Sequence, residues 1–217
     1  NKERLKNGLE KMGIAADETA LDRFEAFHAI LDEYNARMDL TAVLDEDERV
    51  DRHDLDSAAP LAHGLLEQGA KVIDVGTGAG FPGMPLLILR PDLQITFLDA
   101  LNKRILFLED ALKRLGLTAA TLHARAEDAA KMAAHREQYD AAVSRAVANA
   151  ATLEELTLPF VKKGGVAIAW KGPGVADELT AARRAAFLLG GTVRGTVDAP
   201  IPRRADWAHV LLLTDKT

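Results

Sequence analysis

The sequence predicts an α/β fold in which a seven-stranded, mainly parallel sheet with a reversed last strand follows a small helical domain. Two patterns along the 217 residues support this fold. Apolar residues recur at helical spacing up to about residue 67, and short apolar runs then alternate with helical segments. We therefore expect an N-terminal helical cap at 1–67 and a larger α/β domain at 68–217.

The N-terminal region carries the spacing of amphipathic helices. Its two apolar stripes consist of Leu5, Leu9 and Met12, and of Phe24, Phe27, Leu31, Tyr34 and Met38. Such stripes pack one helix face into a core, and Asp17 or Thr19 is the expected N-cap of the second helix. The segment 46–52 is acidic and polar, and Ser57 is expected to cap a short helix that runs to Leu66.

From residue 70 onward, apolar strands alternate with helices, as in a parallel sheet wound on both faces. The predicted strands are 71–75, 94–98, 119–123, 140–144, 165–170, 191–197 and 208–214, and the predicted helices are 82–89, 102–115, 127–132, 149–161 and 175–188. Pro82 and Pro85 are compatible with a helix because they fall in its first turn. No helix separates the last two strands, so we expect one of them to run antiparallel.

Composition narrows the possible functions. The chain has no cysteine, which excludes disulfides, thiolate metal sites and enzymes that form a covalent adduct through a cysteine. No apolar stretch approaches the roughly 20 residues of a membrane-spanning helix. We therefore expect a cytoplasmic protein that acts as a monomer, with neither a membrane nor a metal partner.

Charge is unevenly distributed along the chain. Residues 1–70 hold 8 of the 27 Lys and Arg residues but 17 of the 33 Asp and Glu residues. The rest of the chain therefore has a basic excess, with cations in adjacent pairs or beside glycine turns, namely Lys103-Arg104, Lys113-Arg114, Lys162-Lys163 and Lys171. These cations indicate either an ordinary solvated surface or contacts with nucleic-acid phosphates.

A glycine-rich turn follows the first predicted strand and opens a helix. Glycines let the backbone turn tightly and approach a ligand closely, and the helix start offers free N–H groups. A dinucleotide fingerprint counted from Gly76 needs its third glycine where Phe81 stands. The spacing Asp74-x-Gly76-x-Gly78-x-Gly80 is instead typical of class I S-adenosylmethionine (SAM) methyltransferases, in which the acid helps to hold the loop amides and the methionine end. The alternative is a tight strand-to-helix connection without a ligand.

Two further carboxylates follow the next strands. Asp99 ends the second strand, where it can accept hydrogen bonds from both ribose hydroxyls of a nucleoside over the loop, or cap the helix that starts at Asn102. Glu127 follows the third strand, where it can accept from the adenine amine or cap a short helix. Both positions therefore favour a nucleoside without identifying it.

The fourth strand ends in Ser144-Arg145-Ala146, the position nearest a transferred methyl group. Methyltransferases that act on an exocyclic amine typically carry an Asp/Asn-Pro-Pro-aromatic motif here, which this chain lacks. The acceptor is therefore not expected to be an exocyclic amine. Arg145 at a strand's carboxyl end indicates contact with a ligand or phosphate, with a surface salt bridge as the alternative.

Four segments in order carry a resemblance to a known family. They are Arg52-His53-x-x-Asp56-Ser57, the run 74–83, Ser144-Arg145-Ala146 and Trp170-Lys171-Gly172. From about Leu21 to Thr214 the chain resembles the RsmG (GidB) family of bacterial 16S rRNA guanine-N7 methyltransferases. The resemblance implies a SAM site lined by Gly76, Phe81, Ala126, Glu127 and Arg145. It also implies a substrate, the guanine at position 527 of 16S rRNA, presented as rRNA or as the small ribosomal subunit.

Guanine N7 as the methyl acceptor is consistent with the absence of a recognisable catalytic nucleophile from the sequence. It carries a lone pair and no proton, so it can attack the methyl group without a general base or a nucleophilic residue. We expect Arg145 and Lys171 to act in catalysis and, with His53, to hold phosphate or the acceptor edge of the guanine. His53 has an alternative role as a partner of Asp56, and Lys171 has one as a residue beside a turn.

Two departures from the family pattern affect the predicted RNA contacts. The chain reads Asp39-Leu40-Thr41 where the family usually has Asn-Leu-Thr, and Ala208-His209 where it usually has an Arg-His pair. Arg203 or Arg204 is expected to take the place of the missing arginine. The alternative function is a catalytically silent or differently targeted RNA-binding factor in small-subunit assembly.

Overall fold

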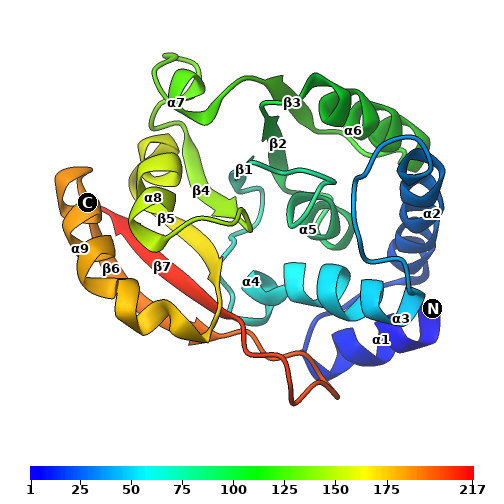
Figure 1. Cartoon of the computed structure of the whole chain (residues 1–217). Coiled ribbons are helices and arrows are strands. Elements are labelled where there is room, and N and C mark those ends of the chain that lie inside the picture. Colours follow the sequence, from blue (N-terminus) through cyan, green and yellow to red (C-terminus); the bar gives the residue numbers. More distant parts are fainter.

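The computed structural model describes residues 1–217 and is built around one seven-stranded sheet (Figure 1). Its strands are β1 Lys71–Val75, β2 Gln94–Asp99, β3 Ala120–His123, β4 Tyr139–Ser144, β5 Val161–Lys171, β6 Gly191–Asp198 and β7 Val210–Lys216. They lie in the order β3-β2-β1-β4-β5-β7-β6. Neighbours among β1 to β5 are parallel, whereas β7 runs antiparallel to β5 and β6. The predicted sheet with a reversed last strand is confirmed.

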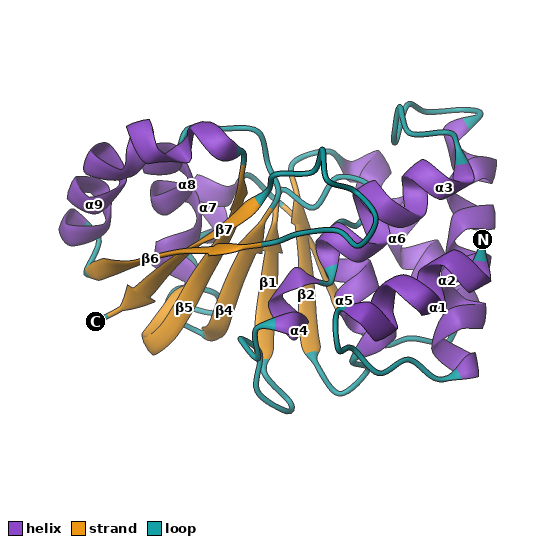
Figure 2. Ribbon diagram, turned by 90° about the horizontal axis from the view of Figure 1, so that it is seen from below, coloured by secondary structure: helices purple, strands orange, loops and turns teal.

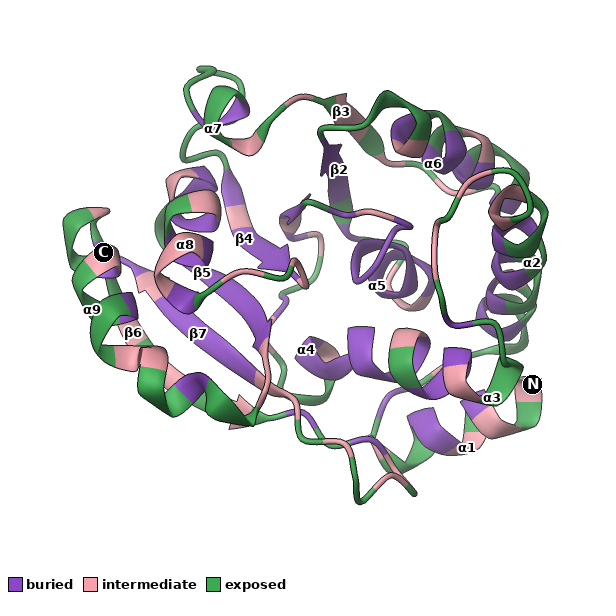
Figure 3. Ribbon diagram, viewed as in Figure 1, coloured by how far each residue is buried: buried purple, intermediate pink, exposed green.

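The sheet separates two groups of helices (Figure 2). On one side lie α2 Glu18–Asn35, α5 Gly83–Leu89 and α6 Asn102–Leu115, and on the other lie α7 Ala126–Ala129, α8 Ala150–Thr157 and α9 Leu179–Leu188. Successive side chains of a strand point to opposite faces. Val72 therefore joins the core that contains Phe107 of α6, while Ile73 joins the core that contains Ala129 of α7. The central strands are buried on both faces (Figure 3).

Several predicted elements end or begin elsewhere in the structure; for example, the helix expected at 175–188 begins at Leu179, after a 3-10 segment at Pro173–Glu178. The helix expected at 149–161 stops at Thr157 and continues as a 3-10 turn over Leu158–Phe160. Pro159 lies in this turn and has no N–H to continue α-helical hydrogen bonding. β5 then begins at Val161, four residues before its predicted start. No helix is both long and apolar enough to cross a membrane.

The N-terminal helices share one apolar core with the sheet. They are α1 Lys2–Lys11, α2, α3 Glu46–Arg49, a π-helical segment at Val50–Leu55 and α4 Ala59–Ala62. Asp17 is the N-cap of α2, where its side chain accepts from Ala20 N. Phe27 of α2 lies 5.8 Å from Phe81 and 6.1 Å from Phe107, measured between ring centroids. The division at residue 67 stays a prediction, since the two parts pack as one body.

Three residues of the acidic and polar segment 46–52, namely Arg49, Val50 and Asp51, are buried, while Glu46, Asp47 and Arg52 are exposed. Arg49 is fully buried and donates to Asp32 and to the carbonyl oxygen of Val43. Asp51 is 1% exposed and lies within salt-bridge distance of Arg4 and Arg204. Buried charges are tolerated where each meets an opposite charge or a hydrogen-bond partner. Such partners come from distant parts of the chain, so local polarity is a poor guide to exposure here.

The prediction for Ser57 is wrong. The helix expected up to Leu66 is limited to α4, and its N-cap is Ala58, which makes no side-chain capping bond. Ser57 is fully buried, and its hydroxyl accepts a hydrogen bond from Arg145 Nη1 at 2.9 Å. Ser57 therefore binds the distant guanidinium of Arg145 instead of capping a local helix, as its residue type alone suggested.

Candidate active site

Asp74 ties the two ends of the glycine loop together. Its Oδ2 accepts from Thr77 Oγ1 at 2.6 Å and from the backbone N–H of Gly83 at 2.8 Å. The side chain is fully buried, and burial raises its pKa to about 7 despite these two bonds and the charge of Arg145. Oδ1 has no hydrogen-bond partner. Asp74 therefore shapes the loop and leaves one buried acceptor unused.

The loop glycines serve two different purposes. Gly76, Gly78 and Gly80 all have positive φ, at 69°, 59° and 98°. A Cβ on Gly80 would lie 2.9 Å from Leu108 Cδ2, so this glycine is needed for packing. A Cβ on Gly78 would meet no protein atom within 4 Å, so this part of the loop faces open space. Gly78 is thus the position where the backbone can approach a ligand most closely.

Asp99 lies at the carboxyl end of β2, directly beside the loop. Its Oδ2 accepts from Gly78 N and its Oδ1 from Leu101 N, both at 2.9 Å. Arg104 Nη1 is 3.5 Å from Oδ2. Because α6 begins at Asn102 without a side-chain cap, Asp99 closes the preceding turn and does not cap this helix. The carboxylate therefore lies against the loop at Gly78 and is 4% exposed.

Ala126 and Glu127 begin α7, next to the end of β3. The carboxyl ends of β2 and β3 are adjacent, since Asp99 pairs in register with His123. The Glu127 side chain is 56% exposed and lies 3.5 Å from Arg125 Nε. The N-cap of α7 is Arg125, so Glu127 does not cap the helix and its carboxylate stays accessible. The buried free oxygen of Asp74, the open face of Gly78 and the carboxylates of Asp99 and Glu127 together fit SAM.

A pocket of about 350 Å³ lies beside this loop, at the carboxyl ends of β4 and β5. It is lined by Arg52, His53, Arg145, Ala146, Val147, Ala148, Trp170, Lys171, Gly172, Trp207 and His209. A Cβ on Gly76 would lie 3.7 Å from Ala146 Cβ, so the loop and the pocket share a border. No carboxylate lines the pocket, which therefore suits an electron-rich or anionic group.

Arg145 fastens the end of β4 to the N-terminal region. Besides its bond to Ser57, it donates from Nη2 to the carbonyl oxygen of Arg52 at 3.0 Å, and its Nε lies 3.4 Å from Asp56 Oδ2. Burial lowers the pKa of this guanidinium, against the nearby charges of Asp56 and Asp74. The side chain is 16% exposed. Arg145 is a fixed part of the pocket wall, and its salt bridge is buried, not on the surface as the alternative supposed.

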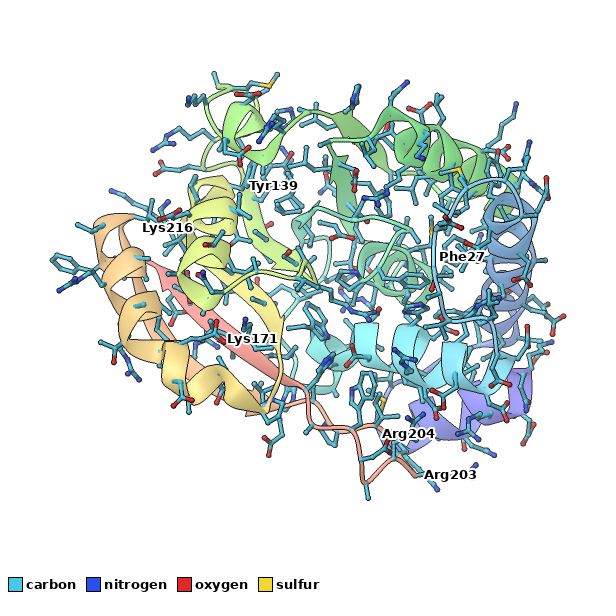
Figure 4. All side chains as sticks on the ribbon, in the orientation of Figure 1. Phe27, Tyr139, Lys171, Arg203, Arg204 and Lys216 are labelled. Carbon is cyan, nitrogen blue, oxygen red and sulfur yellow. The ribbon has the colours of Figure 1, made fainter.

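Of the other predicted cations, Lys171 lines the same pocket as Arg145, whereas Arg203 and Arg204 do not. Lys171 donates to the carbonyl oxygen of Ala148 at 2.7 Å and lies 3.1 Å from Glu178, so it braces the loop after β4. Arg203 and Arg204 lie in the loop between β6 and β7, beside α1 (Figure 4). Arg204 is engaged by Glu48, Asp51 and Asp206, whereas Arg203 is exposed. Only Arg203 offers an unengaged cation in that loop.

His53 is neutral and packed inside the wall. Its ring stacks on Phe81 with a centroid distance of 4.3 Å, and its Nε2 lies 2.9 Å from Thr41 Oγ1. Burial and the charge of Arg145 lower its pKa to about 3. The alternative pairing with Asp56 is wrong, because that carboxylate binds Arg145, Trp207 and His209 instead. At neutral pH His53 adds shape to the site and no positive charge.

This packing predicts a pH effect on stability. Between pH 6.5 and about 3 the unfolded chain binds a proton at His53 that the folded protein does not, so His53 weakens the fold as pH falls. The substitution His53→Phe keeps a ring on Phe81 and removes this titration. We expect urea unfolding to show that the variant loses less stability on acidification than the wild-type protein, by up to about 1.4 kcal/mol per pH unit. Equal slopes for the two proteins would contradict a buried neutral histidine.

Sequence reasoning missed the aromatic side of the pocket. The chain has two tryptophans, and both Trp170 and Trp207 line the pocket. His209 joins them, with its ring 4.6 Å from that of Trp207. Trp170 was noted only as part of a motif and His209 only as a departure from the family pattern. The available signal was the placement of both indoles near the ends of the last strands.

Comparison with known proteins places this site in context. The family described as GidB, rRNA small subunit methyltransferase G, matches residues 20–203. The Clostridium perfringens protein named "Ribosomal RNA small subunit methyltransferase G" is 39% identical over 98% of this chain and 89% of its own length. The protein of the same name from Alkaliphilus metalliredigens is 41% identical with the same coverage.

Solved structures show the same fold at low sequence identity. M. jannaschii TYW2 in complex with AdoMet has a TM-score of 0.59 and 13% identity, covering 80% of this chain and 77% of its own. A TehB-like SAM-dependent methyltransferase from Corynebacterium glutamicum has a TM-score of 0.53 and 17% identity, covering 74% and 88%. The predicted class I SAM-dependent methyltransferase fold is confirmed. The chain belongs to the rRNA small subunit methyltransferase G (GidB) family.

Proposed function

We propose that this protein transfers the methyl group of SAM to N7 of a guanine in 16S rRNA, the guanine at position 527 being the predicted target. Family membership over nearly the whole chain supports an enzyme that uses SAM and acts on small-subunit rRNA. The choice of guanine N7 rests on the resemblance and on the chemistry of the pocket.

The observation that carries the proposal is the shared border of the glycine loop and the pocket. Ala146 lines the pocket, and its Cβ lies where a Cβ on Gly76 of the loop would come within 3.7 Å. A donor held over the loop would therefore reach an acceptor seated in the pocket, where Trp207 is the more exposed of the two indoles. Indole rings bind nucleobases by stacking, and turning a base out of its RNA exposes its edge to such a pocket.

Each part of the site has a defined task in this proposal. Asp74, Gly78 and Asp99 hold SAM, whose sulfonium supplies an activated methyl group. Arg145 and Lys171 are proposed to meet the acceptor edge of the guanine or a neighbouring phosphate, with Arg203 and Arg204 contacting RNA farther out. Guanine N7 needs no proton removed before it attacks, so alignment of the base does most of the catalytic work.

The predicted alternative of a catalytically silent assembly factor has less support. Such a factor could lose the loop that binds SAM, yet Asp74, Gly78 and Asp99 keep their hydrogen bonds in this structure. No cluster of His, Asp or Glu side chains could hold a metal ion. Because the loop and the pocket come from a single chain, we propose a monomer, and the proposed ribosomal substrate supports a cytoplasmic location.

The test is transfer of a labelled methyl group. The protein is incubated with tritiated SAM and with either 16S rRNA or small subunits from a strain that lacks the modification, and the labelled nucleotide is mapped. We expect label at N7 of one guanine at position 527. Label on another base, or on protein alone, would reject the proposed substrate while leaving the fold and the SAM site intact.

A further inference from the structure

One buried residue, Asp56, lies behind the pocket and holds four of its side chains, three through its carboxylate and one through its backbone oxygen. Asp56 is 1% exposed. Trp207 Nε1 donates to its Oδ1 at 3.0 Å, and Arg145 Nε lies 3.4 Å from its Oδ2. His209 Nδ1 lies 3.1 Å and 3.0 Å from the two carboxylate oxygens. Trp170 Nε1 donates to the backbone oxygen of Asp56 at 2.9 Å. The positions of the two indoles and the imidazole thus depend on one residue.

The carboxylate also fixes the tautomer of His209. A carboxylate only accepts hydrogen bonds, so the proton of the neutral ring lies on Nδ1 and the lone pair on Nε2. His209 lines the pocket and is 30% exposed. Arg145 pairs with Asp56, and Arg52 and Lys171 line the same pocket, so these neighbours of the ring offer only donors. Nε2 of the neutral His209 ring is therefore a nitrogen acceptor in the pocket wall, beside several donors.

Guanine offers N1–H as a donor on its Watson–Crick edge, next to the O6 acceptor. Methylation at N7 places a positive charge on the ring system, and this charge makes N1–H a stronger donor. A neutral acceptor opposite N1–H would thus bind the transition state more tightly than the unreacted base. Only interactions that strengthen in this way accelerate the chemical step.

We propose that His209 Nε2 accepts a hydrogen bond from N1–H of the target guanine, and that Asp56 is the positioning residue that keeps this acceptor available. The inference deepens the proposed function and rests on it. In the reaction the N7 lone pair forms the new bond to the methyl carbon, and the S–CH₃ bond breaks with its electron pair left on sulfur. The N1 proton stays on the base, held by His209.

Three variants separate this role from simple packing. His209→Leu removes the acceptor, whereas His209→Gln offers a replacement oxygen. Asp56→Asn presents an N–H to Nδ1, which moves the ring proton to Nε2 and turns the acceptor into a donor, as the equivalent change does in catalytic triads. We expect His209→Leu and Asp56→Asn to lower the single-turnover rate about 10- to 100-fold. The dissociation constant of His209→Leu for rRNA should differ from the wild-type value by less than about threefold, and His209→Gln should recover part of the rate.

Altered substrates identify the contacted atom. The target position carries guanosine, inosine or 2-aminopurine, in whichever form of rRNA or small subunit the wild-type protein methylates. Inosine keeps N1–H and lacks the 2-amino group, whereas 2-aminopurine lacks N1–H. The wild-type protein should discriminate against 2-aminopurine about tenfold more strongly than His209→Leu does, because the two changes remove the same bond. Both proteins should respond equally to inosine.

Two results would overturn the inference. One is undiminished discrimination against 2-aminopurine in His209→Leu. The other is a weakened SAM affinity in this variant by calorimetry, which would make its defect structural. If Asp56→Asn does not fold, the two His209 variants still decide the matter. Failure of the proposed function would look different, because the wild-type protein would then leave guanine N7 unlabelled.

Discussion

Substitution of Gly78 by alanine should abolish most SAM binding while leaving the fold nearly intact. With φ at 59°, an L-residue at this position costs about 1 kcal/mol in backbone strain. No protein atom lies within 4 Å of the added Cβ, which would project into the space that the ligand needs. Steric overlap of this kind costs about 1–3 kcal/mol, so we expect calorimetry to show SAM affinity weakened by up to about 100-fold.

Two other glycines provide matched controls for this experiment. Gly64 also has a positive φ, 62°, with nothing within 4 Å of an added Cβ, and it lies outside the loop. Gly64→Ala should therefore lose the same stability in urea unfolding and none of the SAM affinity. Gly80→Ala should destabilise the fold further, since its Cβ would lie 2.9 Å from Leu108. Equal SAM affinities in Gly78→Ala and Gly64→Ala would show that the loop is not the SAM site.

Substitution of Asp74 by alanine should damage both stability and SAM binding. It leaves the Gly83 N–H and the Thr77 hydroxyl without their acceptor, and each unsatisfied buried group costs about 1–3 kcal/mol. We expect urea unfolding to show a loss of about 2–5 kcal/mol, together with loss of the loop shape that SAM requires. Asp74→Asn keeps an acceptor oxygen and should retain most of the stability at pH 7.

The pH dependence of Asp74 has a definite sign. Burial raises its pKa from 3.8 to about 7, so between these values the unfolded chain has released a proton that the folded protein retains. The contribution of Asp74 to stability therefore falls as pH rises from 3.8 towards 7, by up to about 1.4 kcal/mol per unit. Asp74→Asn should remove this slope. An unchanged slope in the variant would mean that Asp74 is ionised throughout this range.

The geometry of the glycine loop and of the adjoining strand ends could be predicted from the sequence because its signals are local. Asp74, the glycines and Asp99 lie within one strand-turn-helix unit and the end of the next strand, where spacing determines geometry. Parallel pairing then brings these strand ends together without further information. Alternation of apolar runs was likewise enough to locate all seven strands to within a few residues.

The acceptor half could not be predicted in the same way because its contacts join distant residues. Asp56 meets His209 across 153 positions and Trp170 across 114 positions. Nothing in the local pattern of 46–57 indicates burial, since the segment is rich in charge. Its side chains enter the interior only because partners such as Arg145 neutralise them there. Long-range electrostatic pairing of this kind leaves no periodicity to detect.

The Arg145 contacts have a consequence for how this protein can be divided. The side chain is held by Ser57, the carbonyl of Arg52 and the carboxylate of Asp56, all of which precede the predicted boundary at residue 67. A fragment that starts after this boundary would keep the glycine loop and lose the back wall of the acceptor pocket. The N-terminal helices are thus not an interchangeable module for choosing a substrate. Bringing the donor site on the glycine loop to the acceptor pocket therefore requires the N-terminal region and the α/β region in the same chain.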